Sequence, residues 1–191
     1  MDFKKKEPLI ILVAGRARSG KSTLAYYLKE AYQKMERKVV ISPYTKYLKQ
    51  YIEEITGEKI NEEKKPRDLL QQISSKLIKG ILHKKDFFIT RQIEDIEIYS
   101  YFMDVILIPD VRFPEEIEAI KAKFSNVVSI GVIRMNYVSD LTEEQKKDIT
   151  EISLDHYHDY DFEIENKDGL DLQRKALEII QKIEERRLEN E

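Results

Sequence analysis

The segment that most constrains the fold is Gly-Arg-Ala-Arg-Ser-Gly-Lys-Ser at residues 15–22. It follows an apolar run at residues 9–14. After it, apolar residues recur at helical spacing: Leu24, Tyr27, Leu28 and Ala31. A strand, a glycine-rich loop and a helix in this order form a phosphate-binding P-loop, because glycines let backbone N–H groups converge and the helix N-terminus adds positive charge. The sequence therefore predicts a site for the phosphates of a nucleotide.

Each residue type in this loop has an expected role. Lys21 is expected to reach the outer phosphates, and the hydroxyl of Ser22 is expected to bind a bridging Mg²⁺, with Thr23 as an indirect helper. The residues expected to bind ATP are Gly15, Arg16, Ala17, Arg18, Ser19, Gly20, Lys21, Ser22 and Thr23. The alternative, a glycine-rich turn with an incidental lysine, is disfavoured by the flanking strand and helix patterns.

Length and charge limit the class of protein. The chain has 191 residues, a formal net charge of −3, 36% charged residues and no cysteine. This length fits one domain, residues 1–191, and the absence of a basic block disfavours a nucleic acid polymer as partner. No apolar stretch approaches the length of a membrane span, and the lack of cysteine is consistent with a cytoplasmic location. We expect a cytoplasmic protein that binds small anionic ligands and no membrane.

Strand and helix patterns alternate along the chain. The expected strands are residues 8–14, 38–42, 103–109, 127–134 and 161–166. Alternation of this kind predicts the α/β fold of a P-loop NTPase, a mostly parallel five-stranded sheet with helices on both faces. At the end of the chain, the spacing of Leu172, Ala176, Ile179 and Ile183 predicts an amphipathic helix docked on the sheet, with a homodimer seam as the alternative.

A long insertion separates the second and third expected strands. Residues 43–102 look helical throughout and are expected to bind the acceptor substrate. Two apolar stripes run along it, one with Tyr44, Tyr47, Leu48, Tyr51 and Ile55, the other with Leu69, Leu70, Ile73 and Leu77. The tyrosines suit either base stacking or core packing, and core packing is the more common use of aromatics at helical spacing. Further on, the polar residues 137–150 form either a lid or a solvated helix.

A second chemical signal lies at the end of the third expected strand. The apolar residues 105–108 lead through Pro109 to Asp110 and Arg112, at the edge of an open α/β sheet where ligands bind. Asp110 suits a Walker B-like role, organising Mg²⁺ directly or through water, and Arg112 suits a phosphate. Alternatively, Asp110 caps the following helix and Arg112 pairs with a neighbouring glutamate.

Three segments carry a resemblance to a known family. They are residues 15–22, Lys65-Pro66-Arg67-Asp68-Leu69-Leu70-Gln71 and Asp110-Val111-Arg112-Phe113-Pro114-Glu115-Glu116. Weaker similarity extends over Tyr47-Leu48-Lys49, Glu151 and residues 160–166. Together they resemble the deoxynucleoside monophosphate kinases of phages and bacteria, within the P-loop nucleoside monophosphate kinase group.

The resemblance implies transfer of the γ-phosphoryl group of ATP, with Mg²⁺, to a (deoxy)nucleoside 5′-monophosphate. By this resemblance, Lys49, Arg67 and Gln71 face the acceptor, and Arg134 touches ATP or the moving phosphoryl group. The expected catalytic residues are Lys21, Asp110, Arg112 and Arg134, and the expected metal-binding residues are Ser22 and Asp110. The chemistry agrees, since an ionised phosphate acceptor needs positioning and cations rather than a general base.

The chain also departs from that family's pattern. Gln71 is followed by Ile73-Ser74-Ser75-Lys76 where the family has a small-residue pair and an acidic residue, and the stretch between Arg134 and Glu151 contains no arginine. Arg16 and Arg18 are hypothesised to replace those arginines in part. Two rival functions remain open: a P-loop kinase for another small phosphate or hydroxyl compound, and an ATP-binding regulatory module without catalysis.

Overall fold

The computed structural model describes residues 3–60, 66–134, 152–167 and 171–189. Within them, five parallel strands form one sheet in the order β2-β3-β1-β4-β5. The strands are β1 (Leu9–Ala14), β2 (Val39–Ile41), β3 (Val105–Val111), β4 (Val127–Arg134) and β5 (Phe162–Asn166). Four of them lie within segments where the sequence predicts a strand, and β3 extends two residues beyond the predicted segment 103–109. The predicted parallel sheet is confirmed.

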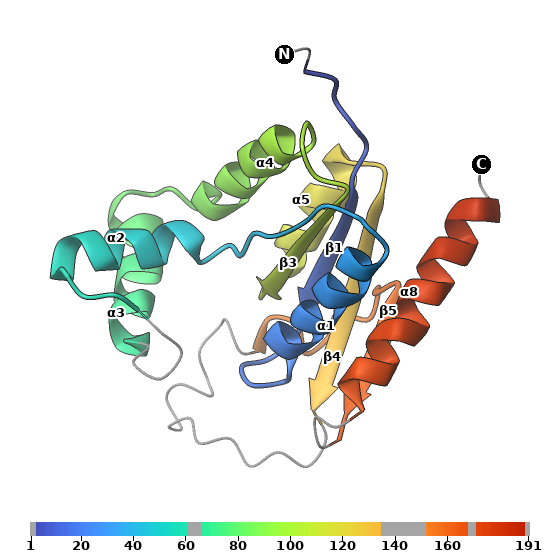
Figure 1. Ribbon diagram of the computed structural model, residues 1–191. Helices are drawn as coiled ribbons and strands as arrows, with labels where there is room; N and C mark the ends of the chain where they lie inside the picture. The colour runs from blue at the N-terminus through green and yellow to red at the C-terminus, as the bar shows by residue number, and fades with distance from the viewer. Residues whose placement is uncertain (1–2, 61–65, 135–151, 168–170, 190–191) are drawn as a thin grey trace.

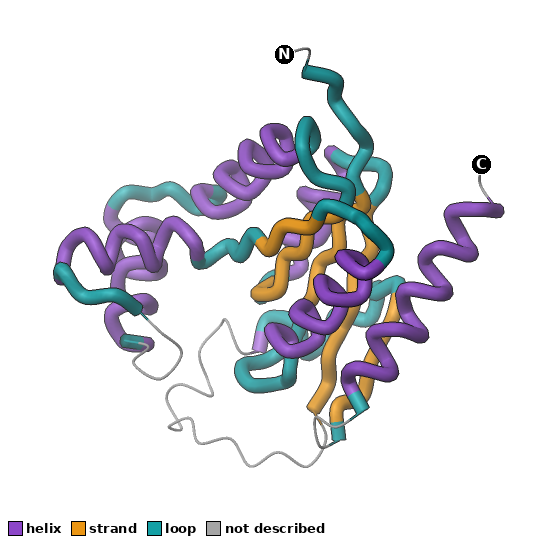
Figure 2. Tube along the Cα trace, in the orientation of Figure 1, coloured by secondary structure: helices purple, strands orange, loops and turns teal. Residues whose placement is uncertain are grey.

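Helices cover both faces of this sheet (Figures 1 and 2). They are α1 (Lys21–Lys34), α2 (Lys46–Thr56), α3 (Arg67–Gln71), the π-helix η1 (Gln72–Ile81), α4 (Phe87–Tyr99), α5 (Pro114–Lys123) and α8 (Leu172–Glu189). β1 is buried along its whole length, and its alternate residues enter two separate cores. A strand buried on both faces is expected to be apolar throughout, as this one is.

The two cores define the two faces. On one face, Ile11 and Val13 of β1 pack with Leu24 and Leu28 of α1 and with the apolar side of α8. The predicted stripe of α8 is confirmed, since Leu172, Ala176, Ile179 and Ile183 are all buried. On the other face, Ile10 and Leu12 pack with residues of α4 and α5. None of the helices in the described ranges is long and apolar enough to cross a membrane.

The insertion is mostly helical and forms a small core of its own. Leu48 and Ile52 of α2 are buried there with Leu70 of α3. In Figure 1, α2 and α3 project to one side of the sheet. The segments at residues 57–60 and 82–86 are not helical, so the expectation of helix throughout residues 43–102 is wrong at these points.

Two residues of the predicted stripes are exposed rather than buried. Ile55 is 73% exposed, in the last turn of α2 before Gly57 ends it, and Ile52 takes the inward position. Leu77 is 41% exposed, and Ile78 is buried in its place. The second shift follows from the π-helix, because i→i+5 bonding makes each turn longer than the α-helical spacing on which the prediction rested. Residues 137–150, the candidate lid, lie outside the described residues.

Candidate functional site

The P-loop connects the carboxyl end of β1 to α1. Gly15 and Gly20 have φ values of 141° and 105°, which favour glycine over any L side chain. Space requires glycine as well. A Cβ on Gly15 would lie 2.4 Å from the carbonyl oxygen of Val132 on β4, and one on Gly20 would lie 2.5 Å from Nδ2 of Asn166 on β5. The loop therefore sits directly against the ends of two neighbouring strands.

Lys21 and the two hydroxyl residues after it open α1. The side chain of Lys21 lies back over the loop, because its ammonium donates a hydrogen bond to the carbonyl oxygen of Arg16 at 2.5 Å. Ser22 and Thr23 are exposed in the first helical turn. Asn166 closes the loop from the other side by donating to the carbonyl oxygen of Ser19 at 2.8 Å. Lys21 and Asn166 thus both bind backbone carbonyls of the loop, next to the N-terminus of α1.

The two arginines of the loop have neighbours from the second half of the chain. The guanidinium of Arg16 binds both carboxylate oxygens of Asp155, with Nε 2.9 Å from Oδ1. Arg134, at the end of β4, donates from Nη1 to the carbonyl oxygen of Arg18 at 2.9 Å. The structure thus brings Arg134 to the P-loop. Asp155 gave no signal in the sequence, since it lies 139 residues from Arg16.

Asp110 lies on a bulge in β3. Leu12 pairs with Ile108 and Ala14 with Val111, so one residue of β1 faces Pro109 and Asp110 together. Proline cannot donate to the ladder, and a bulge removes that requirement. The bulge therefore accommodates Pro109 within a central strand, and it redirects the side chain of Asp110.

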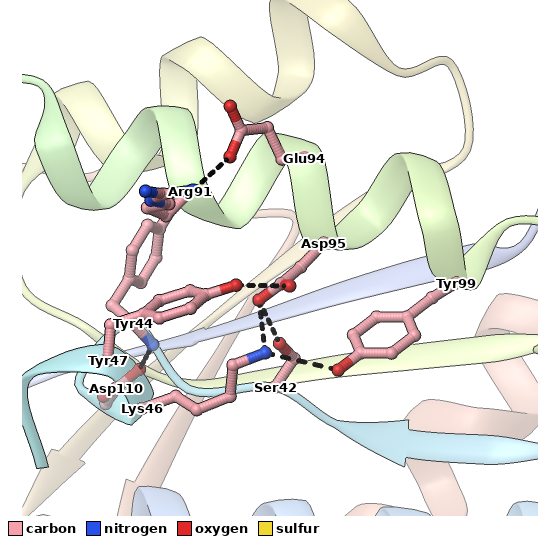
Figure 3. A network of polar contacts seen from close by, with 9 residues as sticks. All are labelled: Ser42, Tyr44, Lys46, Tyr47, Arg91, Glu94, Asp95, Tyr99 and Asp110. Atoms are coloured by element: carbon pink, nitrogen blue, oxygen red, sulfur yellow. Dashed lines mark hydrogen bonds and ion pairs between the residues drawn. The ribbon is translucent and has the colours of Figure 1, made fainter. Parts of the chain in front are cut away.

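The Asp110 carboxylate holds the start of the insertion. It accepts hydrogen bonds from the backbone N–H of Tyr44 at 2.8 Å, from that of Thr45 at 3.0 Å and from the Thr45 hydroxyl at 2.7 Å (Figure 3 shows the bond to Tyr44). The alternative in which Asp110 caps the following helix is wrong. Glu116 has that role, because its Oε2 accepts from the backbone N–H of Arg112 at 2.7 Å and of Phe113 at 3.1 Å.

Replacing Asp110 by Ala should destabilise the fold as well as affect any reaction. The change leaves two backbone N–H groups at the start of α2 without their carboxylate acceptor, which we expect to cost about 2–4 kcal/mol of unfolding free energy. Urea unfolding measures this cost, with Asp159→Ala as the control because Asp159 is an exposed carboxylate. Equal stability of the two variants would contradict this anchoring role.

A second carboxylate, Asp95 of α4, holds the first turn of α2 (Figure 3). Its oxygens accept from the Lys46 ammonium at 2.6 Å and from the Tyr47 hydroxyl at 2.8 Å. Burial lowers the pKa of Lys46, but hydrogen bonds to Asp95 and Tyr99 outweigh it, so the pKa is raised. The beginning of α2 is thus fixed to both β3 and α4, and the Tyr47 hydroxyl is one of its anchors.

Glu116 is a buried carboxyl beside these anchors. Burial raises its pKa from 4.5 to about 7, against the hydrogen bonds from the backbone of Arg112 and Phe113, which lower it. Between these two pKa values the folded protein binds more protons than the unfolded chain. The contribution of Glu116 to stability is therefore complete below about pH 4.5 and is lost as the pH rises through 7.

The variant Glu116→Gln should remove this pH dependence. We measure stability as the unfolding free energy and compare the parent protein with the variant. We expect the parent to lose up to about 3 kcal/mol relative to the variant between about pH 5 and pH 8. Urea unfolding at several pH values gives this difference, and Glu115→Gln, an exposed neighbour, is the matched control. A difference that stays constant with pH would show that Glu116 does not titrate in this range.

The residues expected to face the acceptor all belong to the insertion. Lys49 lies on α2, one turn after the anchored Thr45, and Gln71 ends α3; both are partly exposed. Arg67 begins α3, and its side chain lies outside the described part of the structure. A separate hollow, lined by Lys5, Lys6, Ser100, Lys123 and Asn126 among others, lies at the opposite, amino-terminal end of the strands.

The order of the parallel strands and the glycine-rich loop after β1 together form the α/β fold of P-loop NTPases. No family model and no curated protein matches the chain. Among solved structures, it is similar to the Mycobacterium tuberculosis APS kinase CysC in complex with AMPPNP and APS, at a TM-score of 0.56 and 9% identity over 94% of this chain and 99% of that chain. It is also similar to shikimate kinase from Bacteroides thetaiotaomicron, at a TM-score of 0.51 and 12% identity over 93% and 98%. At these identities the similarity is one of fold.

Proposed function

We propose that this protein transfers the γ-phosphoryl group of Mg·ATP to a (deoxy)nucleoside 5′-monophosphate. An oxygen of the acceptor phosphate attacks the γ-phosphorus, the bond to the bridging β–γ oxygen breaks, and ADP leaves with that electron pair. The products are ADP and the nucleoside diphosphate. The acceptor oxygen is already ionised at neutral pH, so no proton has to be removed.

The P-loop would hold ATP. Backbone N–H groups of residues 15–20 and the N-terminus of α1 would bind the phosphates, and the Lys21 ammonium would exchange the Arg16 carbonyl for phosphate oxygens. Arg134 lies against the same loop and would stabilise charge on the moving group. Arg112, at the carboxyl end of β3, would face the acceptor.

The residues present fit a Mg²⁺ ion bound beside the phosphates. The exposed hydroxyl of Ser22 suits direct coordination. The carboxylate of Asp110 already accepts three hydrogen bonds, which leaves about one of its lone pairs for a water of the ion. When bound, Mg²⁺ would neutralise charge on the β- and γ-phosphates.

The hydrogen bonds that the Asp110 carboxylate accepts are the observation that most favours a phosphate acceptor. A hydroxyl acceptor needs a general base to remove its proton. Asp110 is the carboxylate at the carboxyl end of β3, and three of its roughly four lone-pair positions are already used to hold the start of α2. A monophosphate makes no such demand, so it is the acceptor that agrees best with this geometry.

A second candidate keeps the fold and changes the acceptor. The similar solved structures are kinases named for APS and shikimate, which favours a small acceptor of another kind bound by the insertion. In that case the Asp110 carboxylate would have to release Thr45 before it could act as a base. A third candidate, an ATP-binding module without catalysis, predicts ATP binding and no acceptor-dependent turnover.

The experiment that separates these candidates is a coupled ADP-release assay with Mg·ATP and a panel of ribo- and deoxyribonucleoside monophosphates. We expect turnover on one or a few members, far above the rate without acceptor. Silence across the panel with ATP still bound would contradict the proposal. Activity on APS or shikimate under the same conditions would identify the second candidate.

A further inference from the structure

Lys79 reaches from the insertion to the core of the protein. It lies on η1, and its ammonium is 4.2 Å from the centroid of the Phe113 ring. Phe113 directly follows Arg112 at the carboxyl end of β3 and is the last residue before α5. The contact therefore brings a cation of the acceptor-binding insertion to the segment that carries Arg112.

Glu116 is a buried carboxyl near this ammonium. The positive charge of Lys79 lowers the pKa of Glu116, but burial dominates and keeps that carboxyl partly protonated near neutral pH. Within the described ranges, no carboxylate forms an ion pair with Lys79. A cation on the face of a phenyl ring is held by only about 0.5–2 kcal/mol, less than a phosphate dianion offers. A phosphate near Lys79 would therefore attract the ammonium away from the Phe113 ring.

The negative charge of the two nucleotide substrates makes a cation at this position useful for the reaction. Two nucleotides with several negative charges must approach each other, and cations around the transferred group make that approach favourable. The segment between Arg134 and Glu151 contains no arginine. On the insertion side, Lys79 contacts Phe113, next to Arg112. Lys76 lies on the same helix but is exposed. The two lysines are on different sides of η1, because three residues of a π-helix span about two thirds of a turn.

We propose that Lys79 binds the phosphate of the acceptor nucleotide, opposite Arg112. This inference rests on the proposed function, because it assumes a monophosphate acceptor. The lysine then links the two walls of the acceptor site: η1 provides the ammonium and the end of β3 provides the guanidinium. The role adds a ligand that the sequence did not indicate, since Lys79 and Phe113 meet only in the fold.

The test compares Lys79→Met with the matched control Lys76→Met. At saturating Mg·ATP, we expect the acceptor KM of the Lys79 variant to rise about 10- to 100-fold, with the ATP KM within about twofold of the parent. Lys79→Arg keeps the charge and should recover most of the acceptor affinity. Calorimetric titration with the preferred monophosphate, without ATP, should show the same loss in Lys79→Met.

The outcomes separate this inference from the proposed function. If the parent enzyme turns over a monophosphate and both methionine variants have the same acceptor KM, Lys79 is not a ligand and only the inference is wrong. If acceptor and ATP KM rise together in Lys79→Met and Lys79→Arg alike, the lysine has a structural role, which also overturns it. If the parent neither binds nor phosphorylates any monophosphate, the proposed function is wrong and the inference falls with it.

Discussion

Replacing Lys21 by Met is expected to lower the rate of phosphoryl transfer by about 10²–10³-fold, the usual effect of losing one preorganised donor to the transition state. The Lys21 side chain is only 6% exposed and its ammonium already lies over the P-loop, so little reorganisation is needed to meet a phosphate. The methionine keeps most of the side-chain volume without the charge. The fold should therefore survive, and steady-state kinetics should show a fall in kcat.

The matched control for this change is Lys34→Met. Lys34 is exposed in the last turn of the same helix, so the variant removes one positive charge from α1 far from the loop. Its kinetics should equal those of the parent. If Lys21→Met retained more than about a tenth of the parent activity, the P-loop lysine would not stabilise the transferred group as we propose.

Replacing Gly15 by Ala is expected to cost about 3 kcal/mol or more of unfolding free energy. The new Cβ would lie 2.4 Å from the carbonyl oxygen of Val132, and backbone atoms on a central strand cannot move aside easily. The φ of 141° adds strain of its own. Part of this cost should appear as a displaced P-loop and weaker ATP binding.

Gly57→Ala is the control that separates the cost of the backbone conformation from the cost of steric overlap. Gly57 also has a positive φ, 71°, but a Cβ there would meet nothing within 4 Å. We expect this variant to lose about 1 kcal/mol, the cost of left-handed backbone alone. Urea unfolding of both proteins gives the comparison, and equal losses would mean that the P-loop does not press against β4.

Local patterns in the sequence were enough to predict the parts of the fold that depend on neighbouring residues. The apolar run before Gly15 predicted the central strand, and the spacing from Leu172 to Ile183 predicted the helix on the sheet. Both depend on short-range periodicity, which a single sequence displays. The π-helix was not predicted, because the apolar pattern of its sequence fits an amphipathic α-helix equally well. Only the structure shows that Ile78, and not Leu77, is buried.

The contacts that build the site depend on the fold and could not be read from spacing. Asp95 meets Lys46 from 49 residues away, and Arg16 meets Asp155 across 139 residues. Charged residues make up 36% of the chain, so an individual acid or base carries little information about its partner. Asp110 was predicted as a site residue, but its hydrogen bonds to the start of α2 could not be predicted, because they depend on the pairing of β2 with β3.

The measurement that tests the account most directly follows the label of [γ-³²P]ATP in the presence of Mg²⁺ and each nucleoside monophosphate. The account predicts that the label appears in a nucleoside diphosphate, and that Lys21→Met prevents this. Label found only as inorganic phosphate, or left in ATP with every monophosphate, would contradict transfer to a nucleotide acceptor.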